Sequence, residues 1–359
     1  MFKSIKITNY RGIKELELKN FSRVNLITGK NGTGKTSILE SLFLNFGASN
    51  AGLAGKIHEF RGDFGMTAFG TRVFSSIFPN MNLDVFPTIE IIGNIANPKN
   101  RSKRSLQIIP IRESIGNSPS TEIEKSISGV RFGFKGPSGK SKGTLSWERI
   151  FAIDGSTQGA ALRGSGESSP DLVNANFMTP YLGPTTSWGQ TYSQLSETVK
   201  KRQVPKIVEN LKSMFPNLKD LIPLSEESVG VIYADVGTGT LIPVTLMGAG
   251  FGHVLRLVLT AEHLQDGAIL IDEIEGGLHF TAIDKVIEFI FSISKKNNIQ
   301  FFISTHSDEV LSRFLALSNK NKFAQLASFR ISQRKDKIIA TRFSNKELAE
   351  AAEIQAEIR

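Results

Sequence analysis

The sequence contains no cysteine, which excludes a disulfide framework, a CxxC redox pair and thiolate sites for zinc or iron–sulfur clusters. No apolar run approaches the ~18 residues that a membrane-spanning helix requires. The first residues, Met1 to Lys6, lack the apolar segment that forms the core of a signal peptide. We therefore expect a cytoplasmic protein without a membrane segment.

Acidic residues are fewer than basic ones. The chain has 359 residues, enough for two medium domains or one large domain with insertions. Its 43 Lys and Arg outnumber 34 Asp and Glu, which gives a net charge of +9. Residues 96–170, with 12 basic and 6 acidic residues, hold +6 of this excess. Nucleic acid is compatible with such a balance but is not established by it.

Patterns of strand and helix predict four parts along the chain. The two outer parts alternate strands with helices, as in a mainly parallel α/β sheet. The second part predicts a basic, Gly- and Ser-rich antiparallel β insertion with a flexible stretch at 155–170, and the third predicts a short helical arm. In the last part we expect a strand at 241–246 before an apolar helix. The expected parts are 1–95, 96–176, 177–225 and 226–359.

A glycine-rich segment matches the pattern GxxxxGK[ST] without a gap. A short apolar strand precedes it and a helix of apolar period follows it, which is the context that a phosphate-binding loop needs. Glycines let backbone N–H groups surround phosphates, Lys35 would reach the β- and γ-phosphates, and the Thr36 hydroxyl would bind Mg²⁺. The residues predicted to hold the nucleotide here are Gly29, Lys30, Asn31, Gly32, Thr33, Gly34, Lys35, Thr36 and Ser37.

A second motif ends an apolar strand with two adjacent carboxylates, at Ala268 to Glu273. An acid at the end of such a strand holds the Mg²⁺ sphere in P-loop NTPases, so we assign this role to Asp272. Glu273, one residue later, is suited to act as the general base on the attacking water. A third apolar strand runs into His306, which we expect to contact the γ-phosphate or the attacking water and to be catalytic.

These three motifs, in this order, resemble the ABC-type ATPase head, and in particular the branch that includes repair and chromosome-maintenance ATPases and the OLD-family ATPases of phage defence. The run from Asp272 to His279 resembles the Walker B motif and D-loop of that class, and Asn9 to Ile13 resembles its opening. The resemblance implies an α/β P-loop NTPase fold, a mainly parallel sheet flanked by helices with an antiparallel β subdomain and a short helical insertion. It also implies ATP and Mg²⁺ as cofactors.

The resemblance implies further residues near the nucleotide. Leu246 to Gly250 stands where the class has its signature motif, and Gly248 and Gly250 would offer N–H groups to the γ-phosphate bound by a second copy in a homodimer. The Ser and Gln of that motif are missing. Gln190 is our candidate for the Q-loop residue and a metal ligand, with an ordinary surface Gln as the alternative. Arg11 is either a nucleotide-binding residue or a solvated turn cation.

Full-length OLD proteins fuse this head to a Toprim nuclease, for which the 53 residues after His306 are too few. We therefore expect a stand-alone ATPase subunit that controls a separate effector, such as a Toprim-like nuclease or a toxin, in antiviral defence. One alternative is a repair ATPase that binds DNA directly through Lys99, Arg101, Lys103 and Arg104. Another is a scaffold that sequesters an effector with little turnover.

Overall fold

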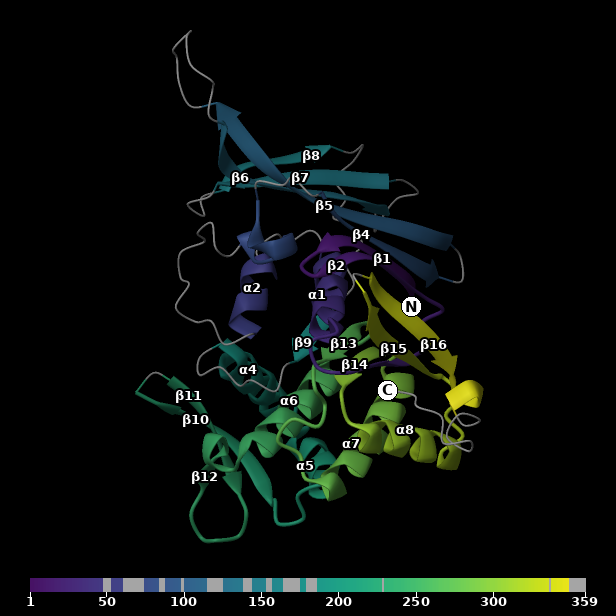
Figure 1. Ribbon diagram of the computed structural model, residues 1–359. Helices are drawn as coiled ribbons and strands as arrows, with labels where there is room; N and C mark the ends of the chain where they lie inside the picture. The colour runs from purple at the N-terminus through teal and green to yellow at the C-terminus, as the bar shows by residue number, and fades with distance from the viewer. Residues whose placement is uncertain are drawn as a thin grey trace. The chain divides into compact units, whose positions relative to one another are not determined.

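The computed structural model describes residues 1–47, 53–60, 74–83, 88–97, 100–114, 125–137, 144–152, 157–163, 175–178, 186–227, 229–335 and 337–348. The chain divides into two units, each assembled from three stretches of sequence (Figure 1). Unit 1 comprises Met1–Phe21, Gly29–Val173 and Ile331–Arg342, and unit 2 comprises Ser22–Thr28, Asn174–Arg330 and Phe343–Arg359. Among the described residues, no helix is long and apolar enough to cross a membrane.

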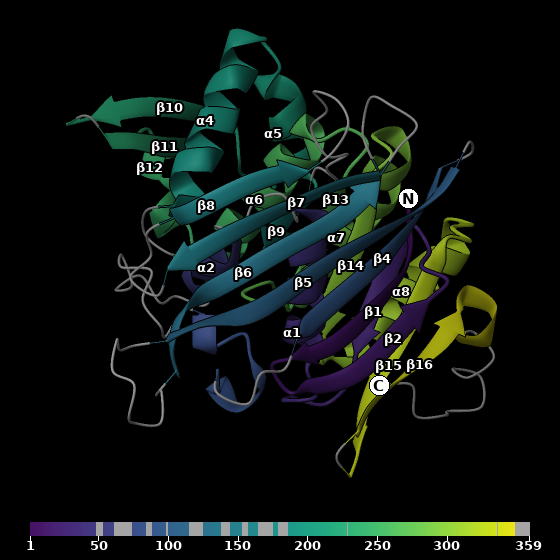
Figure 2. The ribbon, with the colours of Figure 1, turned by 90° about the horizontal axis from the view of Figure 1, so that it is seen from above.

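Unit 1 contains a seven-stranded sheet in the order β2-β1-β4-β5-β6-β7-β8, with every neighbouring pair antiparallel (Figure 2). In β1, Ile5 and Ile7 are buried while Lys6 between them is partly exposed, because successive side chains of a strand point to opposite faces. The strands are β1 (Phe2–Tyr10), β2 (Ile13–Lys19), β4 (Ile89–Asn97), β5 (Asn100–Ser114), β6 (Lys125–Pro137), β7 (Thr144–Ala152) and β8 (Thr157–Arg163).

The basic β segment is a continuation of the first strands and not a sheet of its own. β4 pairs with β1 on one side and with β5 on the other, so a single sheet runs from residue 2 to residue 163. β8 forms within the stretch expected to be flexible, which shows that Gly- and Ser-rich composition alone does not prevent pairing in a sheet. The antiparallel strands were predicted, but their attachment to β1 was not.

Helix α1 (Lys35–Phe46) packs within unit 1 and is buried along most of its length. The ring of its last residue, Phe46, meets the ring of Phe2 edge-on at 4.6 Å. Asn45 donates a hydrogen bond of 2.8 Å from Nδ2 to the carbonyl of Ile91 in β4. Helix α2 (Leu53–Phe60) and the 3-10 turn η1 (Pro79–Met81) also belong to unit 1.

Arg104 in β5 was expected to contact DNA, and this prediction is wrong because the side chain is fully buried. Its Nη2 donates a hydrogen bond of 3.0 Å to the carbonyl of Phe46, and its guanidinium lies 5.4 Å from the centre of the Phe134 ring. A cation at the last carbonyls of a helix stabilises that helix end. Arg104 therefore has a structural role, whereas Lys103 beside it is exposed. Lys99 and the side chain of Arg101 lie outside the described residues.

Unit 2 carries most of a six-stranded sheet in the order β16-β15-β3-β14-β13-β9, in which β15, β3, β14, β13 and β9 are parallel neighbours. The central strands are buried on both faces, which explains their continuous apolar sequences. The strands are β3 (Val24–Thr28), β9 (Ala175–Met178), β13 (Ala268–Ile271), β14 (Gln300–Thr305), β15 (Leu326–Arg334) and β16 (Lys337–Ser344).

Three long helices share one core with this sheet. They are α6 (Ala249–His263), α7 (Phe280–Lys296) and α8 (Asp308–Lys320). Alternate residues of the central strands belong to the same buried cluster as these helices, namely Val24, Leu26, Ile269, Ile271, Phe301 and Ile303. The strand–helix alternation predicted for the C-terminal third is therefore observed.

The rest of unit 2 consists of two helices and a small antiparallel sheet. Helices α4 (Thr186–Lys200) and α5 (Val204–Lys212) match the predicted helical arm, and β10 (Asp220–Glu226), β11 (Val229–Asp235) and β12 (Ile242–Pro243) form the sheet. The strand expected at 241–246 is thus only two residues long. A proline has no N–H to donate, so the ladder stops at Pro243 and the 3-10 turn η2 (Val244–Leu246) follows.

Candidate functional site

The GxxxxGK[ST] segment joins the end of β3 to the start of α1 and has the backbone of a phosphate-binding loop. Gly29, Gly32 and Gly34 have φ angles of 141°, 77° and 95°, a region that side chains other than glycine rarely adopt. A Cβ on Gly29 would lie 2.3 Å from the carbonyl oxygen of Ile331. Gly34 is the left-handed N-cap of α1, so the first N–H groups of this helix adjoin the loop.

The lysine of this motif is directed at its own loop. Lys35 is buried, and its Nζ donates hydrogen bonds of 2.8 and 2.9 Å to the carbonyls of Gly29 and Lys30. Thr33 also donates from Oγ1 to the carbonyl of Lys30, at 2.8 Å. Thr36 and Ser37 follow in the first turn of α1 and are partly exposed, while Asn31 and Gly32 are exposed. The loop thus presents a cation and backbone amides together, which suits a polyphosphate.

Arg11 forms an ion pair with Glu40, a partner that was not predicted from the sequence. Its Nε lies 3.0 Å from Oε2 of Glu40, a residue of α1 with a 2% exposed side chain, and Tyr10 donates a hydrogen bond of 3.2 Å to the same oxygen. Burial, together with the Glu40 charge, raises the pKa of Tyr10 well above its ordinary value. A buried carboxylate needs such partners, so Arg11 neutralises Glu40. Its role toward a nucleotide remains a prediction.

In unit 2, the two carboxylates after β13 are arranged by one serine of β14. Ser304, fully buried, donates a hydrogen bond of 2.5 Å to Oδ1 of Asp272 and accepts one of 2.8 Å from the N–H of Glu273. Asp272 is buried, whereas the Glu273 side chain is 46% exposed. Glu273 has a φ of 47°, a strained conformation that clusters at functional sites in non-glycine residues.

His306 follows β14 and lies beside two acids. Its Nδ1 is 4.0 Å from Oε1 of Glu273 and 3.1 Å from Oε1 of Glu275. The structure therefore brings together Glu273 and His306, the two catalytic residues predicted in unit 2. Sequence reasoning missed Glu275 as a partner of His306, because only the parallel pairing of β13 with β14 places these residues side by side.

The signature-like segment begins α6 with two glycines in different environments. Gly248 is the exposed N-cap of α6, with a φ of 87°, and no side chain caps this end. Gly250 is buried, and a Cβ on it would lie 2.2 Å from the carbonyl oxygen of Gly277. The D-loop-like segment thus passes directly against the start of α6.

Gln190 lies within helix α4 and is exposed, so it is not the loop residue that a Q-loop assignment assumes. The segment 179–185, which follows β9, lies outside the described residues. In the described part of the chain, no group of three or more His, Asp or Glu side chains is arranged to hold a metal by itself. Mg²⁺ takes few protein ligands, and Thr36 and Asp272 stay its predicted ligands.

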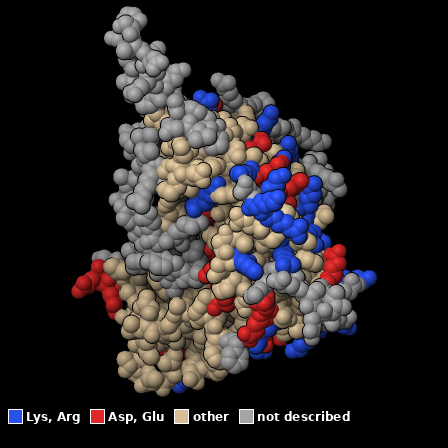
Figure 3. Space-filling model, in the orientation of Figure 1, with Lys and Arg blue, Asp and Glu red and all other residues tan. Residues whose placement is uncertain are grey.

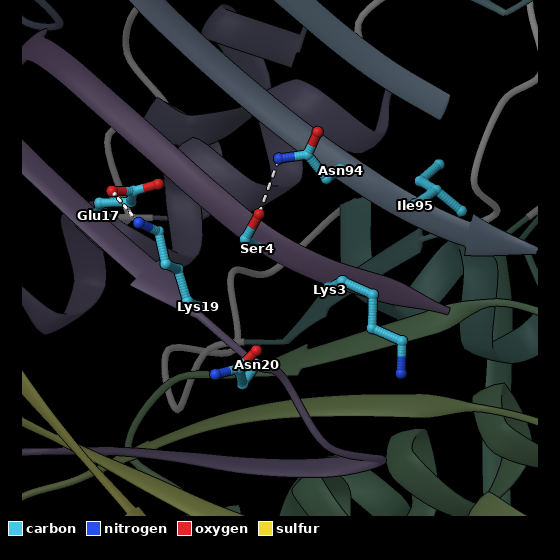
Figure 4. A pocket seen from close by; sticks show the side chains of 7 residues that line it. All are labelled: Lys3, Ser4, Glu17, Lys19, Asn20, Asn94 and Ile95. Atoms are coloured by element: carbon cyan, nitrogen blue, oxygen red, sulfur yellow. Dashed lines mark hydrogen bonds and ion pairs between the residues drawn. The ribbon is translucent and has the colours of Figure 1, made fainter. Parts of the chain in front are cut away.

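A separate cavity of about 440 Å³ opens on the sheet of unit 1 (Figure 4). Asn94 donates a hydrogen bond of 2.8 Å to Ser4 there, and Lys19 pairs with Glu17 at 2.9 Å. Its lining consists of Lys3, Ser4, Glu17, Lys19, Asn20, Asn94 and Ile95, none of which was predicted to bind the nucleotide. This cavity is therefore distinct from the motif residues.

Comparison with protein families supports the reading of the motifs. A family model described as "AAA domain, putative AbiEii toxin, Type IV TA system" matches residues 132–312, half of the chain. The chain belongs to this family. A second model, described as "AAA ATPase domain", matches residues 1–126. The first model thus covers the acids at Asp272, and the second covers the loop at Gly29.

Individual relatives of this AAA domain are distant over the full length and closer over short segments. An "ATP/GTP phosphatase" of Helicobacter pylori is 22% identical over 385 aligned positions, which cover 95% of each chain. The "DNA replication and repair protein RecF" of Clostridioides difficile is 50% identical over 48 residues, 13% of each chain.

Solved structures confirm the predicted fold class. A Smc head bound to the C-winged helix domain of ScpA aligns with a TM-score of 0.50 at 13% identity. The alignment covers 97% of the present chain and 99% of the Smc head. A Smc head with an extended coiled coil, bound to the C-terminal domain of ScpA from Pyrococcus furiosus, aligns at 0.51 and 12%, covering 99% of each. The chain is an AAA-type ATPase domain with the fold of an ABC-type head.

Proposed function

We propose that this chain binds ATP with Mg²⁺ and hydrolyses it. The observation that carries the proposal is the arrangement after β13 and β14, where Ser304 holds Asp272 and Glu273, and His306 lies 4.0 Å from Glu273. The loop that ends at Lys35 follows β3, and Thr28 at the end of β3 pairs in register with Thr305, the residue before His306. The loop therefore begins directly after a strand end that lies beside the end of β14.

Each residue has a distinct task in this proposal. Lys35 and the backbone N–H groups of the loop bind the β- and γ-phosphates. Thr36 and Asp272 hold Mg²⁺, which neutralises charge on the phosphates and fixes their position. Glu273 removes the proton of the attacking water, and its 46% exposed carboxylate is accessible for this step. His306 orients the water or contacts the γ-phosphate.

We further propose that two copies close around ATP. Gly248 and Ala249 at the start of α6 are exposed and no side chain caps this end, so their N–H groups are available to a phosphate on a second copy, whereas the predicted Gly250 is buried. The 20 residues from Val236 to Leu255 contain no Asp, Glu, Lys or Arg, and Leu246 is 75% exposed. Figure 3 shows the surface over β12 free of both charge colours. Scarcity of charge is typical of the centre of a protein interface.

The substitution Glu273→Gln tests hydrolysis and closure together. We expect turnover to fall by about 10²- to 10⁴-fold while ATP binding is retained and a dimer accumulates with ATP and Mg²⁺. The measurements are phosphate release, nucleotide titration and light scattering after gel filtration. Glu309→Gln, an equally conservative change on α8, serves as the control. Unchanged phosphate release by Glu273→Gln would remove Glu273 from the mechanism.

The output of the switch is, in our proposal, a separate effector. ATP binding and release then select between two states that a partner distinguishes. The description of the family includes a toxin of a type IV system, and the motifs resemble OLD-like ATPases, so the proposed effector is a toxin or a Toprim-like nuclease in cytoplasmic antiviral defence. Purification with the product of a neighbouring gene tests this. A stoichiometric complex together with negligible turnover would instead support the sequestering scaffold.

Direct action on DNA is a second candidate, favoured by the short match to RecF. Figure 3 shows Lys and Arg side chains over β1, β4 and β16 with acidic side chains among them. Lys103 and Lys135 are the exposed cations to test, since Arg104 is buried. If DNA is bound here, neutralising both lysines will make the plot of log affinity against log salt less steep, reducing the magnitude of its negative slope by about 2. An unchanged slope would exclude the exposed face of β5 and β6 as the DNA contact.

A further inference from the structure

Glu275 accepts two hydrogen bonds on one oxygen, both from residues at the end of β14, and the same oxygen lies close to the His306 ring. Its Oε1 accepts from Thr305 Oγ1 at 2.9 Å and from the backbone N–H of His306 at 3.1 Å, and Nδ1 of the His306 ring lies 3.1 Å from it. Its other oxygen, Oε2, is buried and has no partner within the described part of the chain. The charge of Glu275 is therefore compensated mainly through the oxygen that faces His306.

The 3.1 Å contact favours one position for the proton of His306. A carboxylate oxygen offers lone pairs and no hydrogen, so a ring nitrogen this close to it is favoured in its N–H form, which is Nδ1–H here. In the neutral ring, the proton then sits on Nδ1, and Nε2 keeps its lone pair. The backbone bond from His306 and the bond from Thr305 fix the carboxylate, and the carboxylate in turn fixes the plane of the ring.

Glu273 is the weaker candidate for this orienting role. Its Oε1 lies 4.0 Å from the same Nδ1, beyond hydrogen-bonding distance, whereas Glu275 is at 3.1 Å. The Glu273 side chain is also more than twice as exposed, at 46% against 20%. Glu273 therefore remains available as a base, while Glu275 is committed to His306.

We propose that Glu275 is a positioning residue that holds His306 as its Nδ1–H tautomer and turns Nε2 outward as a hydrogen-bond acceptor. This inference rests on the proposed ATPase function, and it decides between the two roles left open for His306. A neutral Nε2 acceptor can take a hydrogen bond from the attacking water but cannot donate one to a phosphate oxygen. His306 then orients the water that Glu273 deprotonates.

The tautomer is measurable in the nucleotide-free full chain by ¹⁵N–¹H spectra of the imidazole groups in alkaline buffer. The chain has only five His, and His306→Gln identifies the relevant signals. We expect the protonated nitrogen of His306 to be Nδ1 in the unsubstituted chain. Glu275→Ala should transfer the proton to Nε2, the form that free imidazole side chains prefer in water. Glu275→Gln should retain Nδ1–H, because its amide oxygen still accepts.

Turnover supplies the second readout. We expect Glu275→Ala to lower kcat by about 10- to 100-fold, with KM changed less than about twofold, as for loss of a partner that orients a reacting group. Glu309→Gln is the matched control, because it removes a carboxylate three residues after His306 that pairs only with Arg313 among the described contacts. It should change neither the spectrum nor kcat.

Two results would overturn the proposal: an Nε2–H tautomer in the unsubstituted chain, or an unchanged His306 spectrum in Glu275→Ala. The first needs no variant, so it decides the matter even if Glu275→Ala fails to fold. A chain that shows the Nδ1–H tautomer but hydrolyses no ATP would refute the proposed function and leave the tautomer assignment standing.

Discussion

Gly250 and Gly277 pass so closely that a Cβ on Gly250 would lie 2.2 Å from the carbonyl oxygen of Gly277. Both are backbone positions, so the contact cannot be relieved by rotation of a side chain. Gly277 itself has a φ of 71° and depends on being glycine. The start of α6 and the loop after the two acids are thus locked to each other.

The first prediction follows from this contact. Gly250→Ala should destabilise the protein by about 1–3 kcal/mol, since the added methyl forces the backbones apart. Thermal and urea unfolding followed by circular dichroism measure the change. Gly189→Ala in α4 is the control, because nothing lies within 4 Å of its Cβ position. It should stabilise by about 0.4–1 kcal/mol. A Gly250→Ala protein as stable as the parent would contradict the packing.

The second prediction concerns the loop lysine. Lys35→Met removes the ammonium that lies against the carbonyls of Gly29 and Lys30, so ATP affinity should fall about 10- to 100-fold. Isothermal titration with ATP and Mg²⁺ measures this. Lys30→Met is matched in chemistry and lies in the same loop, but its side chain is exposed and should affect affinity only slightly. Equal losses in both variants would show that only net charge matters.

The third prediction separates structural from surface cations in β5. Arg104→Ala leaves the carbonyl of Phe46 without this donor, and we expect a loss of about 1–3 kcal/mol in unfolding free energy. Lys103→Ala, one residue away and exposed, should stay within about 0.5 kcal/mol of the parent. Denaturant titration distinguishes the two. Similar values for both would mean that Arg104 does not stabilise the end of α1.

The fourth prediction is a dependence of stability on pH that arises in α6. Burial, with a smaller contribution from the Arg256 charge, lowers the pKa of His253 to about 4, and neither ring nitrogen has a hydrogen-bond partner in the described part of the chain. In the unfolded chain the pKa is about 6.5. The neutral ring is therefore favoured in the folded state, and stability present above pH 6.5 is lost as the pH falls toward 4, by about 3 kcal/mol at most.

His253→Leu should remove the pH-dependent loss of stability that His253 causes. The gap in unfolding free energy between His253→Leu and the parent should grow in favour of the variant between pH 6.5 and pH 4. His279→Asn, which changes an exposed His at the start of α7, should leave the parent's pH profile intact. If the unfolding free energies of His253→Leu and the parent changed in parallel with pH, His253 would take up its proton as readily in the folded chain as in the unfolded chain.

The residues that the sequence predicted well belong to local motifs. The turn at Gly29 to Lys35 and the strand that ends at Asp272 carry their own spacing and composition, so each could be recognised from a short window. What the sequence did not reveal depends on distant pairing. Glu275 meets His306 only because β13 and β14 are parallel neighbours, and Glu40 meets Arg11 across 29 positions.

The basic composition of residues 96–170 led to a wrong prediction for Arg104, which was expected to contact DNA. Arg104 is buried because its guanidinium bonds to the carbonyl of Phe46 at the end of α1, 58 positions earlier in the sequence. The strand predicted at 241–246 is shorter than expected because Pro243 has no backbone N–H to donate, which could have been read from the sequence. The first error required the fold to correct it, and the second did not.

The position of β3 has a consequence for how the molecule is made. Asn25 in β3 donates a hydrogen bond to the carbonyl of Phe301, a residue 276 positions later, and β15 pairs on the other side of β3. Contacts so distant in sequence form slowly and late. During synthesis, β3 cannot pair with both of its neighbours until residues 300–334 have left the ribosome. The strand that precedes the loop at Gly29 is therefore completed in its sheet long after the loop itself has been synthesised.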